Sequence, residues 1–410
     1  MVDKNIVIVG ASYAGVNTAH YILKFVLSNL KTPHKVVLVN PSEDLYHRIA
    51  APRAILSSTF YPESKYFYNI PAAFSQYSGS QFSFVHGAAT SVDSTSRSIT
   101  VRTSTNEEIS IPYHALIIAT GAKSLDPVLS TQGGPKSDLT TALKDMQTKL
   151  STARTVIIGG GGPAGVEAAS EIGEYFNGKP GWFGAPKTRK VEIQLITGHE
   201  QLLPILRPTL AKQAENMIRD LGVETRYKTR IEGTEDGEGG TTRVRLAGGE
   251  VLEADVYINA IGTEPMTGWL PSGWVDGKKR VRADKALRVA EAGERVYAVG
   301  DVHDQTRGGM LDLYDSIPVL ATNLKADLLE EEGTKRTHGD RLFEGKTDET
   351  QVVTIGQSKG IGAFGGNKVP SFVIWAMKGR DYMSGMQKNA VEGNKWKKEV
   401  AWKATPLKAA

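Results

Sequence analysis

Short apolar runs, each ending at small or polar residues, recur along the first 300 residues of the chain. Runs of this length without polar alternation are typical of parallel strands that are covered on both faces. A helix is predicted after the first run, from Val16 to about Leu27. The remaining runs predict strands at residues 35–40, 82–89, 113–121, 155–158, 191–196, 254–262 and 295–301, in addition to the first strand at 6–9. We therefore expect an α/β chain built on parallel sheets.

Alternating and polar segments make up the remainder of the chain. Residues 98–102 and 108–112 predict a small antiparallel meander, and residues 351–356 and 360–364 predict a hairpin. Ser316 is a suitable N-cap and Pro318 suits a first helical turn, which predicts a helix to about Leu329. An apolar element is expected at 371–377 and a Trp- and Lys-rich helix at 395–403. Surface loops are expected at 178–186 and 233–240, and a charged linker at 332–347.

A glycine turn follows the first predicted strand. Gly10, Ser12 and Gly15 have the spacing Gly-x-Ser-x-x-Gly. In the dinucleotide-binding fingerprint the first glycine makes the turn, the second lies against the pyrophosphate and the third lets the helix pack on the strand. Ser12 replaces the second glycine, and its small side chain still permits close approach of the backbone. Because the N–H groups and the dipole at a helix start attract phosphate, we predict that a nucleotide binds here.

The second half of the chain repeats this arrangement. The full spacing Gly-x-Gly-x-x-Gly follows the strand at 155–158, with Gly160, Gly162 and Gly165. Each unit later closes with a strand that ends in small residues, which let the chain turn under a cofactor. Thr120 and Gly121 end an Ala-Thr-Gly motif 106 residues after Gly15, and Gly262 comes 97 residues after Gly165. Two similar units in tandem predict two nucleotides, with the chemistry between them.

Further positions are candidates for contacts to a flavin dinucleotide. Asn40 ends the second strand, where an acid usually receives the ribose hydroxyls, and its lack of charge matters little for FAD, which has no 2′-phosphate. The backbone of Ala88 is well placed to read an adenine edge. Arg53 is a candidate for the pyrophosphate or ribose, the alternative being an ordinary solvated arginine. Asp301 ends the strand at 295–301, where a carboxylate can hold the ribityl hydroxyls of a flavin.

The predicted helix start at Ser316 and Pro318 is a candidate for the flavin N1–O2 edge. A helix N-terminus aimed at that edge would stabilise the anionic reduced flavin. The alternative is a capped helix with no role at the cofactor.

Composition removes several functional classes. Cysteine is absent, which excludes disulfides, thiolate metal sites and cysteine redox centres, and no metal site is predicted. The net charge of +4 is too small to indicate nucleic-acid binding. Residues 366–410 carry a balance of +6 and the remainder −2, so the Trp-bearing basic C-terminus is a candidate for peripheral membrane contact. We expect a cytoplasmic protein: a buried strand begins within about five residues of Met1, no apolar run reaches membrane-spanning length, and Val2 excludes N-myristoylation.

Taken in this order, the motifs resemble those of the flavoproteins with two dinucleotide-binding domains. More narrowly, the stretch His47–Arg53 and the C-terminal Lys378-x-Arg-Asp resemble the apoptosis-inducing-factor-like, mitochondrion-associated family, which includes the ferroptosis suppressor proteins. The resemblance implies an FAD-dependent NAD(P)H:quinone oxidoreductase. It also implies that Glu167 positions the nicotinamide, that Asp301 binds FAD and that Lys378 lies near the flavin ring. Ser12, Asn40 and Val2 depart from the family pattern.

The expected architecture is two tandem Rossmann-like domains with a small C-terminal α+β domain. We predict an FAD-binding domain from residues 1–122 and 266–330, an NAD(P)H-binding domain from 123–265, and a C-terminal domain from 331–410. The oligomeric state is not predicted.

The expected function is transfer of hydride from NAD(P)H to FAD and on to a quinone-like acceptor, without a cysteine redox centre. The alternatives are a ferredoxin-type protein, oxygen or a natural-product intermediate as the acceptor, and a redox-sensing interaction protein of the apoptosis-inducing-factor type. Residues 197–199, after the strand at 191–196, contain neither the carboxylate that selects NADH nor an arginine for the 2′-phosphate of NADPH. We therefore expect NADPH to be accepted at least as readily as NADH.

Overall fold

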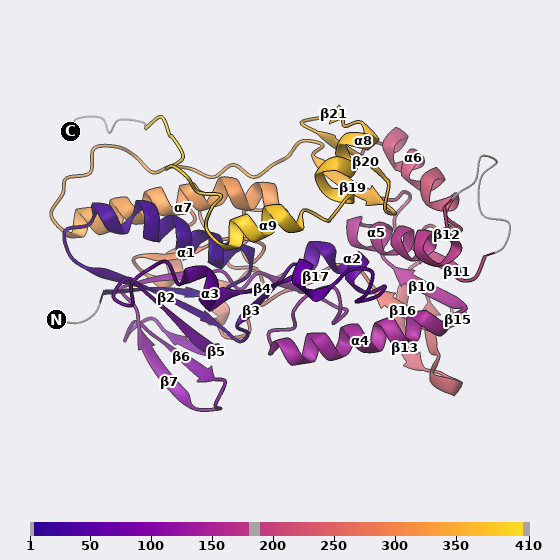
Figure 1. The fold of residues 1–410 in the computed structure, drawn as a ribbon. Coiled ribbons are helices and arrows are strands. Elements are labelled where there is room, and N and C mark those ends of the chain that lie inside the picture. The colour runs from indigo at the N-terminus through magenta and orange to yellow at the C-terminus, as the bar shows by residue number, and fades with distance from the viewer. Residues whose placement is uncertain (1–3, 180–188, 405–410) are drawn as a thin grey trace.

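A seven-stranded sheet forms one half of the molecule in the computed structural model, which describes residues 4–179 and 189–404 (Figure 1). Its order is β18-β8-β1-β2-β5-β6-β7, and the first five strands run parallel. The long β5 continues into an antiparallel meander with β6 and β7, as predicted. The strands are β1 Lys4–Val9, β2 His34–Asn40, β5 Phe82–Asp93, β6 Ser98–Thr103, β7 Glu108–Pro112, β8 Ala115–Ile118 and β18 Val296–Ala298.

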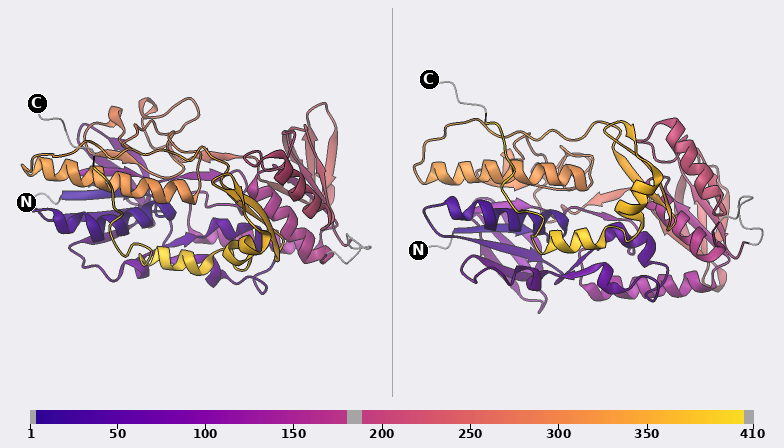
Figure 2. Two further views of the ribbon diagram at one scale, coloured as in Figure 1. Left: turned by 90° about the horizontal axis from the view of Figure 1, so that it is seen from above. Right: turned by 45° about the horizontal axis from the view of Figure 1, so that its top comes forward.

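Both faces of this sheet are buried, which explains the uninterrupted apolar runs. Ile6 and Ile8 point to the face covered by α1 (Tyr13–Phe25) and α7 (Met310–Glu331), which lie side by side in Figures 1 and 2. Val7 and Val9 point to the other face, where they share a core with residues of β6 and with Trp274. Alternate residues of one strand therefore stabilise two separate layers.

The second half contains a parallel sheet in the order β12-β11-β10-β16, with α4, α5 and α6 around it (Figure 1). The elements are α4 Lys136–Thr152, β10 Thr155–Gly159, α5 Pro163–Ile172, β11 Glu192–Ile196, α6 Pro208–Arg219, β12 Val223–Arg226 and β16 Val256–Asn259. The predicted loop at 178–186 lies largely outside the described residues. The predicted loop at 233–240 is wrong in its first half, because those residues belong to a strand. An antiparallel sheet forms there from β13 Ile231–Asp236, β14 Thr242–Leu246 and β15 Val251–Ala254.

Two antiparallel strands connect the halves. β9 (Ala122–Ser124) pairs with β17 (Thr263–Pro265), so the chain leaves and re-enters the first half side by side. The predicted domain borders at 122/123 and 265/266 fall on this pair. Smaller elements near it are β3 Asp44–Tyr46, α2 Ala51–Ala54, β4 Phe67–Asn69 and α3 Ile70–Phe74. Single turns of 3-10 or π-helix complete the described structure: Leu27–Asn29, Arg48–Ala50, Glu63–Lys65, Gly173–Asn177, Glu238–Gly240, Ser272–Trp274, Ala290–Ala292 and Trp375–Gly379.

The C-terminal residues form a separate layer that touches both halves (Figure 2). The hairpin of β19 and β20 is confirmed and packs on α5 and α6, whereas α9 returns to α1. The predicted linker contains neither helix nor strand at 334–347. The elements are β19 Gln351–Ile355, β20 Lys359–Phe364, β21 Asn367–Lys368, α8 Ser371–Ile374 and α9 Ser384–Val391.

The helix predicted at 395–403 is wrong. Trp396 is only 5 % exposed and its indole N–H donates to Asn17 Oδ1 on α1 at 3.0 Å, which requires the segment to run along α1 without helical turns. Trp396 is therefore part of the core and is not a membrane-facing side chain. Within residues 4–179 and 189–404, no helix is both long and apolar enough to cross a bilayer.

The start of α7 also differs from the prediction. The helix begins at Met310, six residues before Ser316, and Pro318 lies inside it. The hydroxyl of Ser316 donates to the carbonyl oxygen of Leu313 within the helix and caps nothing. Because Leu313, Ile317 and neighbouring residues are buried in the core between α1 and α7, packing holds the extra turns together despite the missing N–H of Pro318.

Candidate flavin and nicotinamide sites

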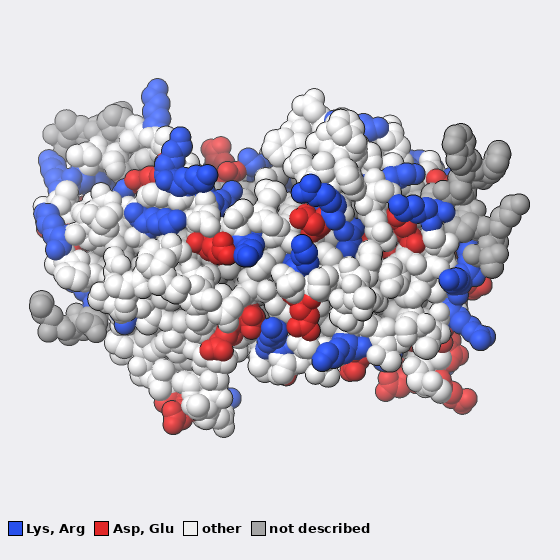
Figure 3. Space-filling view, in the orientation of Figure 1, with Lys and Arg blue, Asp and Glu red and all other residues white. Residues whose placement is uncertain are grey.

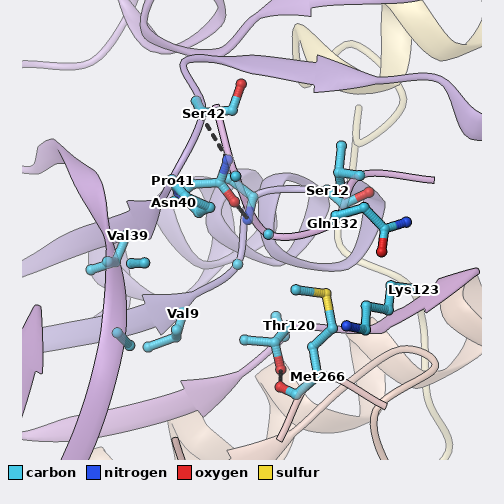
Figure 4. Close-up of a pocket in the computed structure, with 18 of the residues that line it drawn as sticks. Val9, Ser12, Val39, Asn40, Pro41, Ser42, Thr120, Lys123, Gln132 and Met266 are labelled. Carbon is cyan, nitrogen blue, oxygen red and sulfur yellow. Dashed lines mark hydrogen bonds between the residues drawn. The ribbon is translucent and has the colours of Figure 1, made fainter. Parts of the chain in front are cut away.

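A cavity of about 380 Å³ lies at the carboxyl ends of β1 and β2 (Figure 4). Gly10 turns the chain there with φ +102°, and a Cβ on it would lie 2.5 Å from the carbonyl oxygen of Ala119. A Cβ on Gly15 would lie 1.7 Å from the carbonyl oxygen of Gly10, so no other residue fits at the helix start. These are the first and third glycine roles of the fingerprint. Ser12, Asn40, Ala88 and Thr120 also line the cavity.

Asn40 supports the turn itself. Its Oδ1 accepts the backbone N–H of Ala11 at 2.9 Å, and its Nδ2 donates to the carbonyl oxygen of Ser42 at 2.7 Å (Figure 4). On the opposite wall, the hydroxyl of Thr120 donates to the carbonyl oxygen of Met266 at 2.7 Å. These three hydrogen bonds lie at the ends of β1, β2, β8 and β17, which surround one space.

A second cavity continues the first and shares Ser12, Thr120 and Met266 with it. Gly121, Asp301 and the start of α7 line its far end. Asp301 Oδ1 accepts the N–H of Gly309, the N-cap of α7, at 3.1 Å, and Oδ2 accepts Arg48 at 2.7 Å. The helix start at this cavity is therefore Gly309–Met310, whereas Ser316 and Pro318 are buried further along α7.

The two connected cavities fit an elongated dinucleotide. A turn that no side chain larger than hydrogen can occupy lies at the middle, a carboxylate lies at one end, and a backbone-lined wall at Gly87–Ala89 lies at the other. This arrangement suits phosphate, ribityl and adenine groups respectively.

The second glycine turn has the same geometry. Gly160 has φ +112°, and a Cβ on it would lie 2.4 Å from the carbonyl oxygen of Ala260. A Cβ on Gly165 would lie 1.9 Å from the carbonyl oxygen of Gly160, whereas Gly162 faces open space. Gly262, which follows β16, has φ +72° and also faces open space. Gly162 thus leaves room for a phosphate at the N-terminus of α5.

Glu167 and Lys378 form a buried ion pair between α5 and the C-terminal layer. The ammonium of Lys378 lies 2.5 Å from Glu167 Oε1, and the N–H of Thr354 donates to the same oxygen at 2.9 Å. The side chains are 10 % and 4 % exposed, so the pair is shielded from water. Neither residue is among the described residues that line the two cavities.

Arg53 occupies a different place from the one predicted. Its guanidinium is buried against Glu171, one turn after Glu167 on α5, with a shortest distance of 2.6 Å, and the ring of Tyr382 lies 4.6 Å away. Although burial disfavours the charged form, Glu171 raises the pKa of Arg53. Arg53 is not among the described residues that line the two cavities, and Arg48 supplies the arginine there.

The sequence profile of the pyridine nucleotide-disulphide oxidoreductase family matches residues 4–323. The chain belongs to this family. Oxidoreductase phnG of Penicillium herquei is 39 % identical over 407 residues, covering 96 % of this chain and 97 % of the relative. Ferroptosis suppressor protein 1 of Taeniopygia guttata is 25 % identical over 92 % of each chain. The structure of NDH2 from Plasmodium falciparum in complex with NADH matches with a TM-score of 0.66 at 14 % identity, over 97 % of this chain and 99 % of that one.

These findings confirm the predicted fold class and the resemblance to the apoptosis-inducing-factor-like flavoproteins. The protein is an oxidoreductase that uses FAD and NAD(P)H. Although the family is named for disulphide chemistry, this member has no cysteine.

His47 connects the second cavity, through Tyr13, to the C-terminal layer. Its Nε2 must donate to the carbonyl oxygen of Tyr382 at 2.7 Å, because a carbonyl only accepts. Its Nδ1 then accepts the hydroxyl hydrogen of Tyr13 at 2.7 Å, and Tyr13 lines the second cavity. Burial lowers the pKa of His47 to about 4, so the imidazole is neutral at pH 7.

A third cavity, an open apolar groove of about 1370 Å³, lies between α1, the start of α7 and the C-terminal layer. Met310 lines both this groove and the second cavity, so the two spaces meet at the first residue of α7. The groove is built by residues that are far apart in the sequence, and no sequence motif marks it. The same holds for Arg48, whose only signal was its place within the stretch His47–Arg53.

Proposed function

We propose that this oxidoreductase passes the hydride equivalent of NAD(P)H through FAD to a quinone-like acceptor. The observation that carries the proposal is Met310, which separates the cavity that fits the flavin from a large apolar groove. A flat apolar molecule in the groove would approach the flavin from the side of α7. Bound FAD supplies the hydride chemistry, and the protein supplies binding and orientation.

Most of the predicted site residues have a proposed task, whereas Arg53 is given none because it lies against Glu171. Gly10, Ser12 and Gly15 hold the FAD pyrophosphate, Ala88 and Asn40 the adenosine, and Asp301 the ribityl hydroxyls. Thr120, Gly121 and the N-terminus of α7 border the ring. Gly160, Gly162, Gly165 and Gly262 hold NAD(P)H. Ser316 and Pro318 are given no contact to the cofactor, since they lie inside α7.

Glu167 and Lys378 are the proposed catalytic pair. One oxygen of Glu167 receives both Lys378 and Thr354, which fixes the carboxylate rigidly and leaves the other oxygen for the nicotinamide amide. An ammonium held in a water-poor place stabilises negative charge that develops beside it. Lys378 is thus proposed to favour the reduced flavin.

The absence of cysteine supports an external acceptor. With no dithiol in the whole chain, electrons have no protein group to which they can pass from the flavin. They must leave directly for a molecule bound next to it.

Anaerobic reduction followed by reoxidation tests the proposal. We expect NADH and NADPH each to bleach the flavin absorbance, with kcat/KM for NADPH at least equal to that for NADH, and menadione to restore the absorbance within seconds. Oxygen-saturated buffer is the control acceptor and should act at least tenfold more slowly. If neither coenzyme bleaches the flavin, NAD(P)H is not the electron donor. If oxygen reoxidises the flavin as fast as menadione does, a quinone is not the preferred acceptor. A preference for NADH above about tenfold, roughly 1.4 kcal/mol, contradicts the coenzyme expectation.

A further inference from the structure

The apolar groove contains positive charge but no negative charge. Among the described residues that line it, three are lysines, namely Lys24, Lys395 and Lys397, and none is Asp or Glu. The others are mainly methionine, aromatic and aliphatic side chains, including Met377, Met383, Met386, Phe25 and Tyr314. White atoms of uncharged residues predominate over α8 and β20 in Figure 3, although Lys359 of β20 and Lys368 of β21 are exposed lysines.

Two of the three ammonium groups in the groove have neighbours that are not carboxylates. Lys24 donates to the carbonyl oxygen of Gly393 at 2.6 Å, and Lys395 lies 3.7 Å from the centre of the Tyr314 ring. Within the described residues, no Asp or Glu lies within 4 Å of either nitrogen. Other lysines of the same region are paired: Lys325 with Glu399 and Lys388 with Glu392.

The two ammonium groups differ in exposure: Lys24 is partly buried, whereas Lys395 is exposed along the rim of the groove. Burial lowers the pKa of both Lys24 and Lys395, which means that the charged forms are poorly solvated. A cation that has lost part of its hydration and has no counter-ion gains more from an incoming anion than a fully hydrated cation does.

The apolar side chains of the groove favour flat, ring-containing ligands. Methionine side chains adapt to flat rings and make favourable contacts between sulfur and aromatic edges, and Tyr314, Phe25 and Trp396 add aromatic surface. Long unbranched chains would gain nothing specific from these aromatic neighbours.

We propose that the groove binds a flat aromatic molecule with a negative charge, an ionised phenol or a carboxylate, held by Lys24 and Lys395. This molecule is the electron acceptor, a role that rests on the proposed function. The binding site itself is independent of that function.

Binding of a redox-inactive probe tests the site. We expect 1-hydroxy-2-naphthoate to bind the FAD-loaded full chain in calorimetry, and Lys395→Gln to weaken it at least fivefold. Lys24→Gln should act in the same direction. Lys398→Gln is the matched control, since it removes the same charge from the same segment at a residue that does not line the groove, and should change the affinity less than twofold. Neutral 2-naphthol should bind the wild type and Lys395→Gln within twofold of each other.

Three results of the calorimetric binding experiment would contradict an anion-binding site in the groove. These are no binding of naphthoate at millimolar concentration, equal weakening by Lys398→Gln, and equal weakening of 2-naphthol by Lys395→Gln. Lys24→Gln removes a hydrogen bond to Gly393 and can loosen the C-terminal segment. The ammonium of Lys395 donates no hydrogen bond to the described residues, so Lys395→Gln tests the charge alone.

Turnover separates this inference from the proposed function. Lys395→Gln should lower kcat/KM for 1,4-naphthoquinone-2-sulfonate at least fivefold and leave that for menadione within twofold. Because each quinone is compared with itself in two proteins, differences in reduction potential cancel. If Lys395→Gln changes kcat/KM equally for both quinones, the acceptor is not recognised by its charge, and the proposed quinone reduction still stands. No turnover of either quinone, with binding of naphthoate still dependent on Lys395, overturns the proposed function while the site stands.

Discussion

Asp301 and Arg48 face each other at the end of the second cavity, and each has other hydrogen bonds that fix it. Arg48 also donates to the carbonyl oxygen of Ala122 at 2.7 Å, and Asp301 accepts Gly309. The carboxylate is thus held where the ribityl chain of FAD is proposed to lie.

Asp301→Ala should therefore lose most of its flavin on purification. Hydrogen bonds to a charged group contribute about 1.5–3 kcal/mol, which predicts roughly ten- to hundredfold weaker binding of FAD. The ratio of flavin to protein absorbance measures this. Asp315→Ala is the control, because Asp315 is an exposed carboxylate on α7, the helix whose N-cap Asp301 contacts, and is paired with Lys346; this variant should keep its flavin. Full flavin content in Asp301→Ala would remove Asp301 from the site.

At the residue scale, the sequence indicated which residues stand at a turn or a strand end better than it indicated which side chains they contact. Gly10, Gly15 and Asp301 are recognisable because backbone geometry and strand ends restrict which residues fit there. Arg48 and Arg53 stand five residues apart, and only the tertiary structure decides which one meets Glu171 and which one meets Asp301.

The helix starts at the two glycine turns are the elements that define the site. In the second turn, Gly162 and Gly165 are three residues apart and differ completely in the space around them. They form a matched pair for substitution.

Gly165→Ala should destabilise the protein by about 3 kcal/mol or more, because its Cβ meets a backbone oxygen that cannot move aside. Gly162→Ala should change the free energy of unfolding by less than about 1 kcal/mol, since its φ of −78° suits alanine and nothing lies within 4 Å of the new Cβ. Urea unfolding measures both. Gly162→Ala should raise KM for NAD(P)H, because the methyl group enters the space proposed for a phosphate. Equal unfolding midpoints for the two variants would contradict this reading of the turn.

At the element scale, strands covered on both faces were predictable, and the exceptions have common physical causes. The early start of α7 and the helix absent at 395–403 both result from long-range burial, of Leu313 in one case and of Trp396 in the other. Local capping and helix propensity are worth about 1 kcal/mol, which burial of a large side chain exceeds. The strand at 231–236 is acidic and exposed, and only its pairing with β14 reveals it.

At the scale of the whole molecule, the last described residues attach the C-terminal segment to α1. Trp396 packs on Tyr21 with ring centres 5.0 Å apart, and Val400 donates its N–H to the hydroxyl of Tyr21. Trp402 lies further along, half-buried, against His338.

Trp396→Ala should therefore destabilise the protein by about 3–5 kcal/mol, and Trp402→Ala by less than about 1.5 kcal/mol. Thermal unfolding of the flavin-loaded protein measures the difference. Equal melting temperatures for the two variants would contradict the assignment of Trp396 to the core.

Three buried histidines make the assembled molecule sensitive to acid. Burial lowers the pKa of His20, His47 and His303 to about 4. His20 and His47 each bind a carbonyl oxygen of the C-terminal layer, at Val391 and Tyr382. Protonation of His20 or His47 therefore affects hydrogen bonds that attach the C-terminal layer to the rest of the protein.

We expect the free energy of unfolding to fall between pH 7 and pH 5. The unfolded histidine has a pKa near 6.5, so below that value the unfolded state binds protons that the folded state refuses until about pH 4. The slope is about 1.4 kcal/mol per pH unit for each histidine. Urea unfolding at pH 7, 6 and 5 measures it, and His20→Gln should flatten the slope whereas His199→Gln, at an exposed site, should not. A pH-independent midpoint over this range is the contrary result.

The contact between Asn17 and Trp396 joins residues separated by 379 positions, and it has a consequence for synthesis of the chain. Ribosomes add about 5–20 residues per second, so α1 waits roughly 20 to 75 s between its own emergence and that of its partner. During that interval the faces of Tyr21 and His20 that the C-terminal segment later covers are open to other chains. The seven-stranded sheet also lacks β18 and its covering helix α7 until residue 331 has been made. Newly made protein should therefore depend on chaperones until its last residues arrive, and expression at low temperature, where synthesis slows, would lengthen that dependence.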